Sequence, residues 1–172
     1  MWKRNRIVLT LISFALGLTL GQAVIFSYEN SVFHPWTWGE DGNPIIANCY
    51  GEDFNILYIE RAVEYWEAKA GEQIGFIEQN PPKEVCDYEM LDGFIILRKS
   101  RSLGSHTIAS TKRRTALGKI RAAEIRFSPG SFKLDYIVEH ELGHALGYQH
   151  IEEEGHIMYP TYDRMGSKFW LP

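Results

Sequence analysis

Basic residues are scarce in this sequence, and it has no internal repeat, low-complexity tract or linker. Its 172 residues include 18 lysines and arginines against 22 aspartates and glutamates, which leaves a formal net charge of −4. No basic stripe is present to attract nucleic acid, and the one basic run, Lys112-Arg113-Arg114, is interpreted as a solvated turn. Apolar residues make up 45% of the chain, which excludes a disordered protein. We therefore expect a monomer with one folded domain and no nucleic-acid partner.

Charge is also absent from residues 7–26, where leucine, isoleucine, valine and phenylalanine dominate. Three basic residues precede this run: Lys3, Arg4 and Arg6. A basic start followed by an apolar run is typical of a secretory signal peptide or an uncleaved signal anchor. The run would just span a bilayer core of about 30 Å, and small residues around Ala23 would allow cleavage. We expect residues 1–26 to be this signal or anchor and residues 27–172 to form a secreted or periplasmic domain. Membrane attachment through residues 7–26 stays open.

Cysteine is rare as well, since the chain has only Cys49 and Cys86. In an exported protein, an even number of cysteines favours a disulfide bond between them. The alternative is two unpaired, half-buried thiols. A disulfide requires Cα atoms about 4.4–6.8 Å apart, and the sequence does not show whether these two approach that closely. Both interpretations stay open.

Hydrophobic periodicity divides the chain into strands and two helices. Residues 53–69 carry apolar side chains at helical spacing, which predicts an amphipathic helix that ends at Gly71. A second long helix is predicted from about residue 132 to residue 146. Strands are predicted at residues 44–48, 74–78 and 93–97, and a hairpin at residues 105–127 with its turn around 115–119. This order of elements predicts an α+β domain.

Four of the six histidines fall between His140 and His156. His140 and His144 lie four residues apart in the second predicted helix, so their rings share one face and can bind one metal ion. Glu141 follows the first of them and can reach a water molecule beside that metal. This is the H-E-x-x-H pattern of zinc hydrolases. The alternative for the five residues alone is a solvated polar face of the helix.

The residues that follow favour the metal site over the polar face. Gly147 can adopt the left-handed conformation that ends a helix and redirects the chain. His150 can then return to the same metal ion. Three neutral imidazoles with one open position form the tetrahedral site that a catalytic zinc requires. We therefore expect one catalytic zinc ion, and neither a calcium site nor a second zinc site is evident.

The complete pattern from His140 to His150 resembles that of the metzincin zinc peptidases. Eight residues after the third histidine comes Met158, within the stretch from Ile157 to Tyr162. Metzincins have a methionine-containing turn beneath the zinc. The order of residues in this stretch is similar to that of the matrixin branch. The resemblance covers residues 36–162 and is most specific from His140 onward.

This resemblance implies a zinc metalloendopeptidase that hydrolyses proteins or peptides. It implies a metzincin-like fold, with a twisted mixed sheet and two long helices, of which the second carries the zinc-binding motif. Glu141 would be the catalytic base, and Met158 would form the turn beneath the metal. Pro160 and Tyr162 would contribute a wall of the substrate pocket, and the strand near residues 108–111 would pair with an extended substrate.

Several residues depart from the family pattern. Ile151, after the third histidine, fits none of the well-known metzincin branches, and Cys49 is a poor match to an inhibitory cysteine motif. His106 is interpreted as an ordinary surface or strand histidine and His156 as a bystander. Two alternatives remain beside the peptidase: an inactive binding module on a metzincin scaffold, and a membrane-anchored structural protein with an incidental histidine cluster.

Overall fold

The computed structural model describes residues 37–38, 42–100, 102–104 and 106–170. These residues belong to one compact unit that runs from Trp36 to Pro172. The expected signal or anchor, residues 1–26, lies outside the described residues and stays a prediction. Within the described part of the chain, no helix combines the length and the apolar character needed to cross a membrane.

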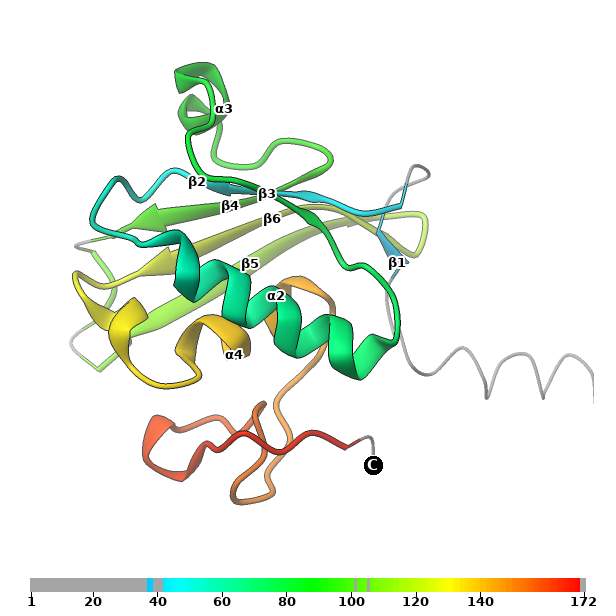
Figure 1. Ribbon diagram of the computed structural model, residues 1–172, viewed down its shortest axis with the longest axis vertical. Coiled ribbons are helices and arrows are strands. Elements are labelled where there is room, and N and C mark those ends of the chain that lie inside the picture. The colour runs from blue at the N-terminus through cyan, green and yellow to red at the C-terminus, as the bar shows by residue number, and fades with distance from the viewer. Residues whose placement is uncertain (1–36, 39–41, 101, 105, 171–172) are drawn as a thin grey trace, which may run out of the picture. The chain divides into compact units, whose positions relative to one another are not determined.

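A mixed sheet of six strands forms the centre of this unit (Figure 1). The strands are β1 (Thr37–Trp38), β2 (Ile45–Asn48), β3 (Phe76–Glu78), β4 (Phe94–Lys99), β5 (Ala109–Ala116) and β6 (Lys119–Phe127). Five of them are parallel in the order β1-β6-β4-β2-β3, and β5 pairs antiparallel with β6. Among the described strands β5 pairs with β6 alone, so its other edge has free backbone groups. The predicted hairpin and edge strand are confirmed.

The first helix, α2, spans Ile56–Ala70. It begins after Asn55, whose side chain accepts a hydrogen bond from the backbone N–H of Leu57, and such a cap stabilises a helix N-terminus. It ends at Gly71, which has a left-handed φ of 72°. The helix buries the side chains on one stripe: Ile59, Ala62, Val63 and Trp66. This confirms the predicted amphipathic helix, although it begins three residues later than expected.

The second helix, α4, spans Ile137–Ala145 and is shorter than predicted. The expected start near residue 132 is wrong, because a separate 3₁₀ turn, η2, occupies Ser131–Lys133 and Leu134 is extended after it. Tyr136 then adopts a left-handed φ of 63°, which interrupts any continuous helix. The helix therefore begins at the following residue.

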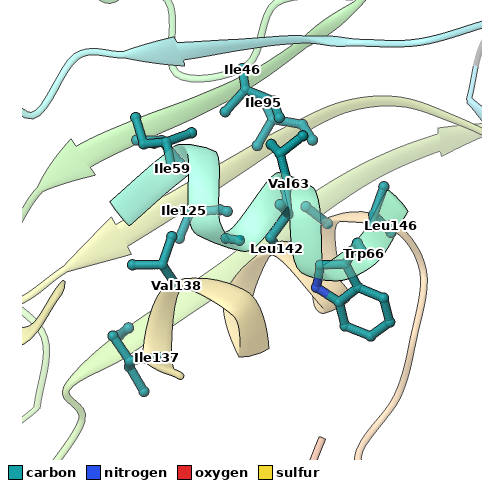
Figure 2. Close-up of a cluster of buried hydrophobic side chains, with 14 of the residues drawn as sticks. Ile46, Ile59, Val63, Trp66, Ile95, Ile125, Ile137, Val138, Leu142 and Leu146 are labelled. Atoms are coloured by element: carbon teal, nitrogen blue, oxygen red, sulfur yellow. The ribbon is translucent and has the colours of Figure 1, made fainter. Parts of the chain in front are cut away.

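Both helices cover one face of the sheet, and the main core lies between the layers (Figure 1). Figure 2 shows side chains from the two layers meeting there. Ile46, Ile95 and Ile125 come from the sheet and are each at most 1% exposed. They face a group of buried side chains from the helices: Ile59, Val63 and Trp66 of α2 with Val138 and Leu142 of α4. This packing positions α4 against the sheet.

A short helix, α3 (Lys83–Asp87), lies on the opposite face of the sheet (Figure 1). It is tied to the end of β2 by a disulfide between Cys49 and Cys86, whose Cα atoms are 5.5 Å apart. The question that the sequence left open is thus answered in favour of the disulfide. Arg98 of β4 also donates a hydrogen bond to the backbone oxygen of Cys86, at 2.6 Å.

The basic run Lys112-Arg113-Arg114 lies inside β5, and its interpretation as a solvated turn is wrong. Two of its residues point to the outer face of the sheet. Lys112 lies 3.9 Å from a carboxylate oxygen of Glu89, and Arg114 forms an ion pair with Asp92. Backbone pairing with β6 and these ion pairs explain why a charged run forms a strand here.

Candidate active site

Three histidine side chains converge beside α4. His140 and His144 project from the helix, and His150 lies beyond its end. Nε2 of His144 lies 3.1 Å from Nε2 of His140 and 3.1 Å from Nε2 of His150. Among the described residues, these three histidines form the group of side chains that could bind a metal ion together.

Hydrogen bonds on the far sides of two rings orient them for metal binding. Nδ1 of His140 donates to the backbone oxygen of Ile157, and Nδ1 of His144 donates to that of Tyr148, both at 2.8 Å. A carbonyl oxygen can only accept, so the proton of each neutral ring is on Nδ1 and the lone pair is on Nε2. The lone pairs therefore face one another.

Burial keeps these histidines neutral at physiological pH. It lowers the pKa of His140 to about 4 and that of His144 to about 3, and it also lowers the pKa of His150. Tetrahedral Zn–N bonds of about 2.0–2.1 Å would place the ligand nitrogens about 3.3 Å apart. The observed separations of 3.1 Å and the unprotonated nitrogens fit a zinc ion.

A turn after α4 returns the chain to the metal centre. Gly147 has a φ of 111°, a conformation that favours glycine, and its N–H donates to the backbone oxygen of His144 at 3.0 Å. The N–H of Tyr148 donates to the backbone oxygen of Gly143 at 3.0 Å, and the ring of Tyr148 stacks on that of Trp66. The predicted role of Gly147 as the helix stop is confirmed.

Met158 is fully buried beneath α4, at 0% exposure. A Cβ atom at Gly143 would lie 2.6 Å from Sδ of Met158 and closer still to the indole of Trp66. Only glycine fits at this point of the helix, despite its cost of about 1 kcal/mol in a helix interior. The close contact puts the methionine turn directly against the helix that carries the histidines.

Glu141 is nearly buried, at 5% exposure, and its side chain lies beside the metal centre in the same cleft. The hydroxyl of Thr111, from β5, donates to Oε2 of Glu141 at 2.5 Å. Burial raises the pKa of Glu141 to about 7, and the bond from Thr111 opposes this rise. A carboxylate with a pKa near neutrality can accept and release a proton under physiological conditions.

A cleft of about 630 Å³ runs over these residues. It lies between the free edge of β5, the exposed side of α4 and the segment after Met158. Pro160 and Tyr162 both line it, and Tyr162 is 41% exposed. Of the site residues that the sequence singled out, all but the buried Met158 therefore line one cleft.

Comparison with known proteins agrees with this geometry. Residues 36–172 match the family model described as Matrixin. The chain belongs to the matrixin family. Its fold is the α+β metzincin fold that the resemblance implied.

This matrixin is also similar to a solved structure described as High choriolytic enzyme 1 (HCE-1), a hatching enzyme zinc-protease from Oryzias latipes (medaka fish). The two have a TM-score of 0.34 and 17% sequence identity, over 68% of this chain. The matched part spans 50% of the length of that enzyme's chain. Comparison with curated proteins gives no match.

Two partners in the cleft of this matrixin were not predicted from its sequence. Thr111, which holds Glu141, and Arg113, whose Nη1 donates to the backbone oxygen of His144 at 2.5 Å, both come from β5. They precede their partners by 30 and 31 residues. No local sequence pattern predicts contacts over such distances. The one available signal was that side chains of the predicted edge strand point alternately to its two faces, so every second one faces the cleft.

His156 lies outside the ligand cluster, as expected for a bystander, but its side chain has a structural role that the sequence did not reveal. Its ring is fully buried, Nδ1 accepts a hydrogen bond from the N–H of Met158 at 2.9 Å, and Nε2 donates to the backbone oxygen of Trp170 at 3.0 Å. The neighbouring Ile157 also bonds to the C-terminal segment, since its N–H donates to the backbone oxygen of Lys168 at 2.7 Å. His156 therefore joins the methionine turn to the C-terminal segment.

Replacing His156 with alanine is expected to lower the free energy of unfolding by about 2–4 kcal/mol, because it opens a cavity and leaves a buried N–H and a partly buried carbonyl oxygen of the backbone without their partner. Denaturant unfolding of the metal-free protein measures this loss. His106→Ala is the matched control, since His106 is exposed and should change stability by no more than about 0.5 kcal/mol. Equal stability of the two variants would contradict this role.

Proposed function

We propose that this matrixin is a zinc-dependent endopeptidase in which His140, His144 and His150 hold the metal and Glu141 is the general base. One observation carries the proposal: ring nitrogens of three histidines converge beside a buried carboxylate in a cleft. Histidine is a preferred ligand of catalytic zinc, and three protein ligands leave one position open for water or substrate.

The chemistry divides between the metal and the side chains. A zinc ion held by the three rings would supply Lewis-acid chemistry, which polarises a carbonyl group and makes water more acidic. Glu141 accepts the proton of the attacking water and later delivers it to the leaving amine. Thr111 holds the carboxylate in place through its hydroxyl group, at 2.5 Å.

The walls of the cleft suit an extended peptide. The free edge of β5 offers backbone N–H and C=O groups along one side, and an added strand gains main-chain hydrogen bonds there. Pro160 and Tyr162 line the pocket for a substrate side chain, and Met158 supports the metal centre from below. Proteins or peptides are therefore the proposed substrates.

Digestion of a peptide library by the soluble domain tests this function. We expect internal peptide bonds to be cleaved, cleavage to stop when a chelator removes zinc, and activity to return when zinc is restored. A domain that binds one zinc ion per chain but cleaves no peptide would overturn the proposal. It would favour the alternative of an inactive binding module on the same scaffold.

We further propose that the catalytic domain, residues 27–172, works outside the cytoplasm as a secreted or periplasmic protein. Two observations support this: the basic start with its charge-free run, and the disulfide between Cys49 and Cys86, which persists in oxidising compartments. A reporter fused after Pro172 that was active only in the cytoplasm would contradict the proposal.

A further inference from the structure

The side chain of Arg113 points into the cleft, unlike those of its two basic neighbours. Side chains alternate along a strand, so Lys112 and Arg114 reach the outer face, where they meet Glu89 and Asp92. Arg113 lies between them, lines the cleft and donates from Nη1 to the backbone oxygen of His144 at 2.5 Å. Its guanidinium group has further N–H donors that this one bond does not use.

The charge of Arg113 has no counterion within the described chain. Three other arginines of the domain are paired with buried carboxylates: Arg61 with Glu139 at 2.6 Å, and Arg98 and Arg126 with Glu124 at 3.0 and 2.8 Å. No described carboxylate forms such a pair with Arg113, and burial lowers its pKa with no neighbouring charge to offset the effect. A partly buried cation without an anion favours a ligand that brings one.

The position of Arg113 along the cleft follows from two contacts. β5 and α4 run side by side in the same sense, because Thr111 bonds Glu141 and Arg113 bonds His144. Arg113 therefore lies about 7 Å beyond the proposed base, at about 3.4 Å per strand residue. The opposite end of the cleft is lined by apolar side chains: Ile108, Leu134 and Ile137. The cleft thus has an apolar end and a cationic end.

We infer that Arg113 is a specificity-determining residue that selects peptides with an acidic side chain about two residues from the scissile bond. This inference rests on the proposed peptidase function. The carboxylate of the substrate would accept a charge-assisted hydrogen bond from the free part of the guanidinium. A substrate that pairs antiparallel with β5, the commoner arrangement of strands, has this side chain before the cut. The substrate class is therefore acidic peptides with an apolar residue toward the other end of the cleft.

Matched peptides test this inference with the zinc-loaded protein. Each pair carries Glu or Gln at one position, and the position is moved along the peptide on both sides of the cut. We expect the native protein to cleave the Glu peptide with a kcat/KM about tenfold higher at one position, about two residues before the cut. Tenfold corresponds to about 1.4 kcal/mol. Added salt should reduce the preference, because Arg113 is only partly buried.

Variants of Arg113 separate selectivity from general damage. Arg113→Gln should abolish the preference, and Arg113→Glu should reverse it in favour of a Lys peptide. Arg114→Gln is the matched control and should keep the native preference, because that side chain pairs with Asp92 on the outer face. A structural defect would instead lower kcat/KM for both members of each pair alike.

The possible results distinguish this inference from the function on which it rests. Cleavage of neutral peptides without any preference for Glu would overturn the role of Arg113 alone. A preference that persists in Arg113→Gln would do the same. Failure to cleave any peptide would overturn the proposed peptidase function as well.

Discussion

Replacing Glu141 with glutamine is expected to lower the kcat for peptide hydrolysis by about 10²–10⁴-fold, the usual contribution of a general base. The amide keeps the shape of the carboxylate but does not accept a proton from water. The loss should fall on kcat more than on KM, since the proton transfer occurs only in the transition state. Steady-state kinetics on a peptide found in the library digestion measures both constants.

The structure explains why this variant should remain folded and keep its zinc. Glu141 is not among the converging ligands, and the oxygen of a glutamine can still accept the hydrogen bond from Thr111. Zinc should therefore stay at one ion per chain. Glu152→Gln is the control, because Glu152 is an exposed carboxylate near the site. It should retain native activity.

Activity that survives in the Glu141→Gln variant would require another base, and the structure disfavours two candidates close to it in the sequence, Glu139 and His156. The carboxylate of Glu139 is bound to Arg61 at 2.6 Å, on the side of α4 that faces α2. Both ring nitrogens of His156 are occupied by backbone groups. A variant with most of the native kcat would therefore contradict the proposed mechanism as a whole.

Replacing His144 with alanine is expected to weaken zinc binding by at least about 100-fold. Loss of a supporting residue around a metal typically costs about 10–100-fold in affinity, and loss of a ligand removes a bond to the metal itself. His144 is the central ring of the cluster, with its Nε2 3.1 Å from those of both other histidines. Competition with a chelator of known affinity measures the change.

Unfolding experiments provide a second measurement for the same variant. Zinc that binds only the folded state should raise the Tm of the native protein, and it should raise that of His144→Ala far less at equal concentration. His106→Ala is the matched control, because His106 is exposed and lies outside the ligand cluster. Unchanged zinc content in His144→Ala would overturn the ligand assignment.

The cluster of three histidines could be predicted from the sequence because its members are close together along the chain. His140 and His144 share a helix face at a spacing of four residues, and Gly147 supplies the left-handed turn that returns His150. The strands and α2 were predicted on similar grounds, since periodicity within one element depends on a few neighbouring residues. These features need no knowledge of the rest of the fold.

Predictions from the sequence were wrong where contacts between distant segments outweighed the local preference for a helix or a turn. The apolar spacing from residue 132 to residue 146 suits a helix, yet the backbone at Tyr136 is left-handed and α4 begins after it. The basic run at Lys112-Arg113-Arg114 suits a turn, yet it pairs along its length with β6. A charged strand is stable here because its partners are supplied by segments elsewhere in the chain.

The sequence by itself determined the family and predicted the type of metal and its ligands, because these depend on residue types at fixed short spacing. Only the tertiary structure decided what surrounds them: the disulfide, the bond from Thr111 to Glu141, the unpaired charge of Arg113 and the burial of His156. Each of these depends on sheet register and on packing between elements. A shift of one residue in the pairing of β5 with β6 would turn Thr111 and Arg113 away from the cleft, and no local rule specifies that register.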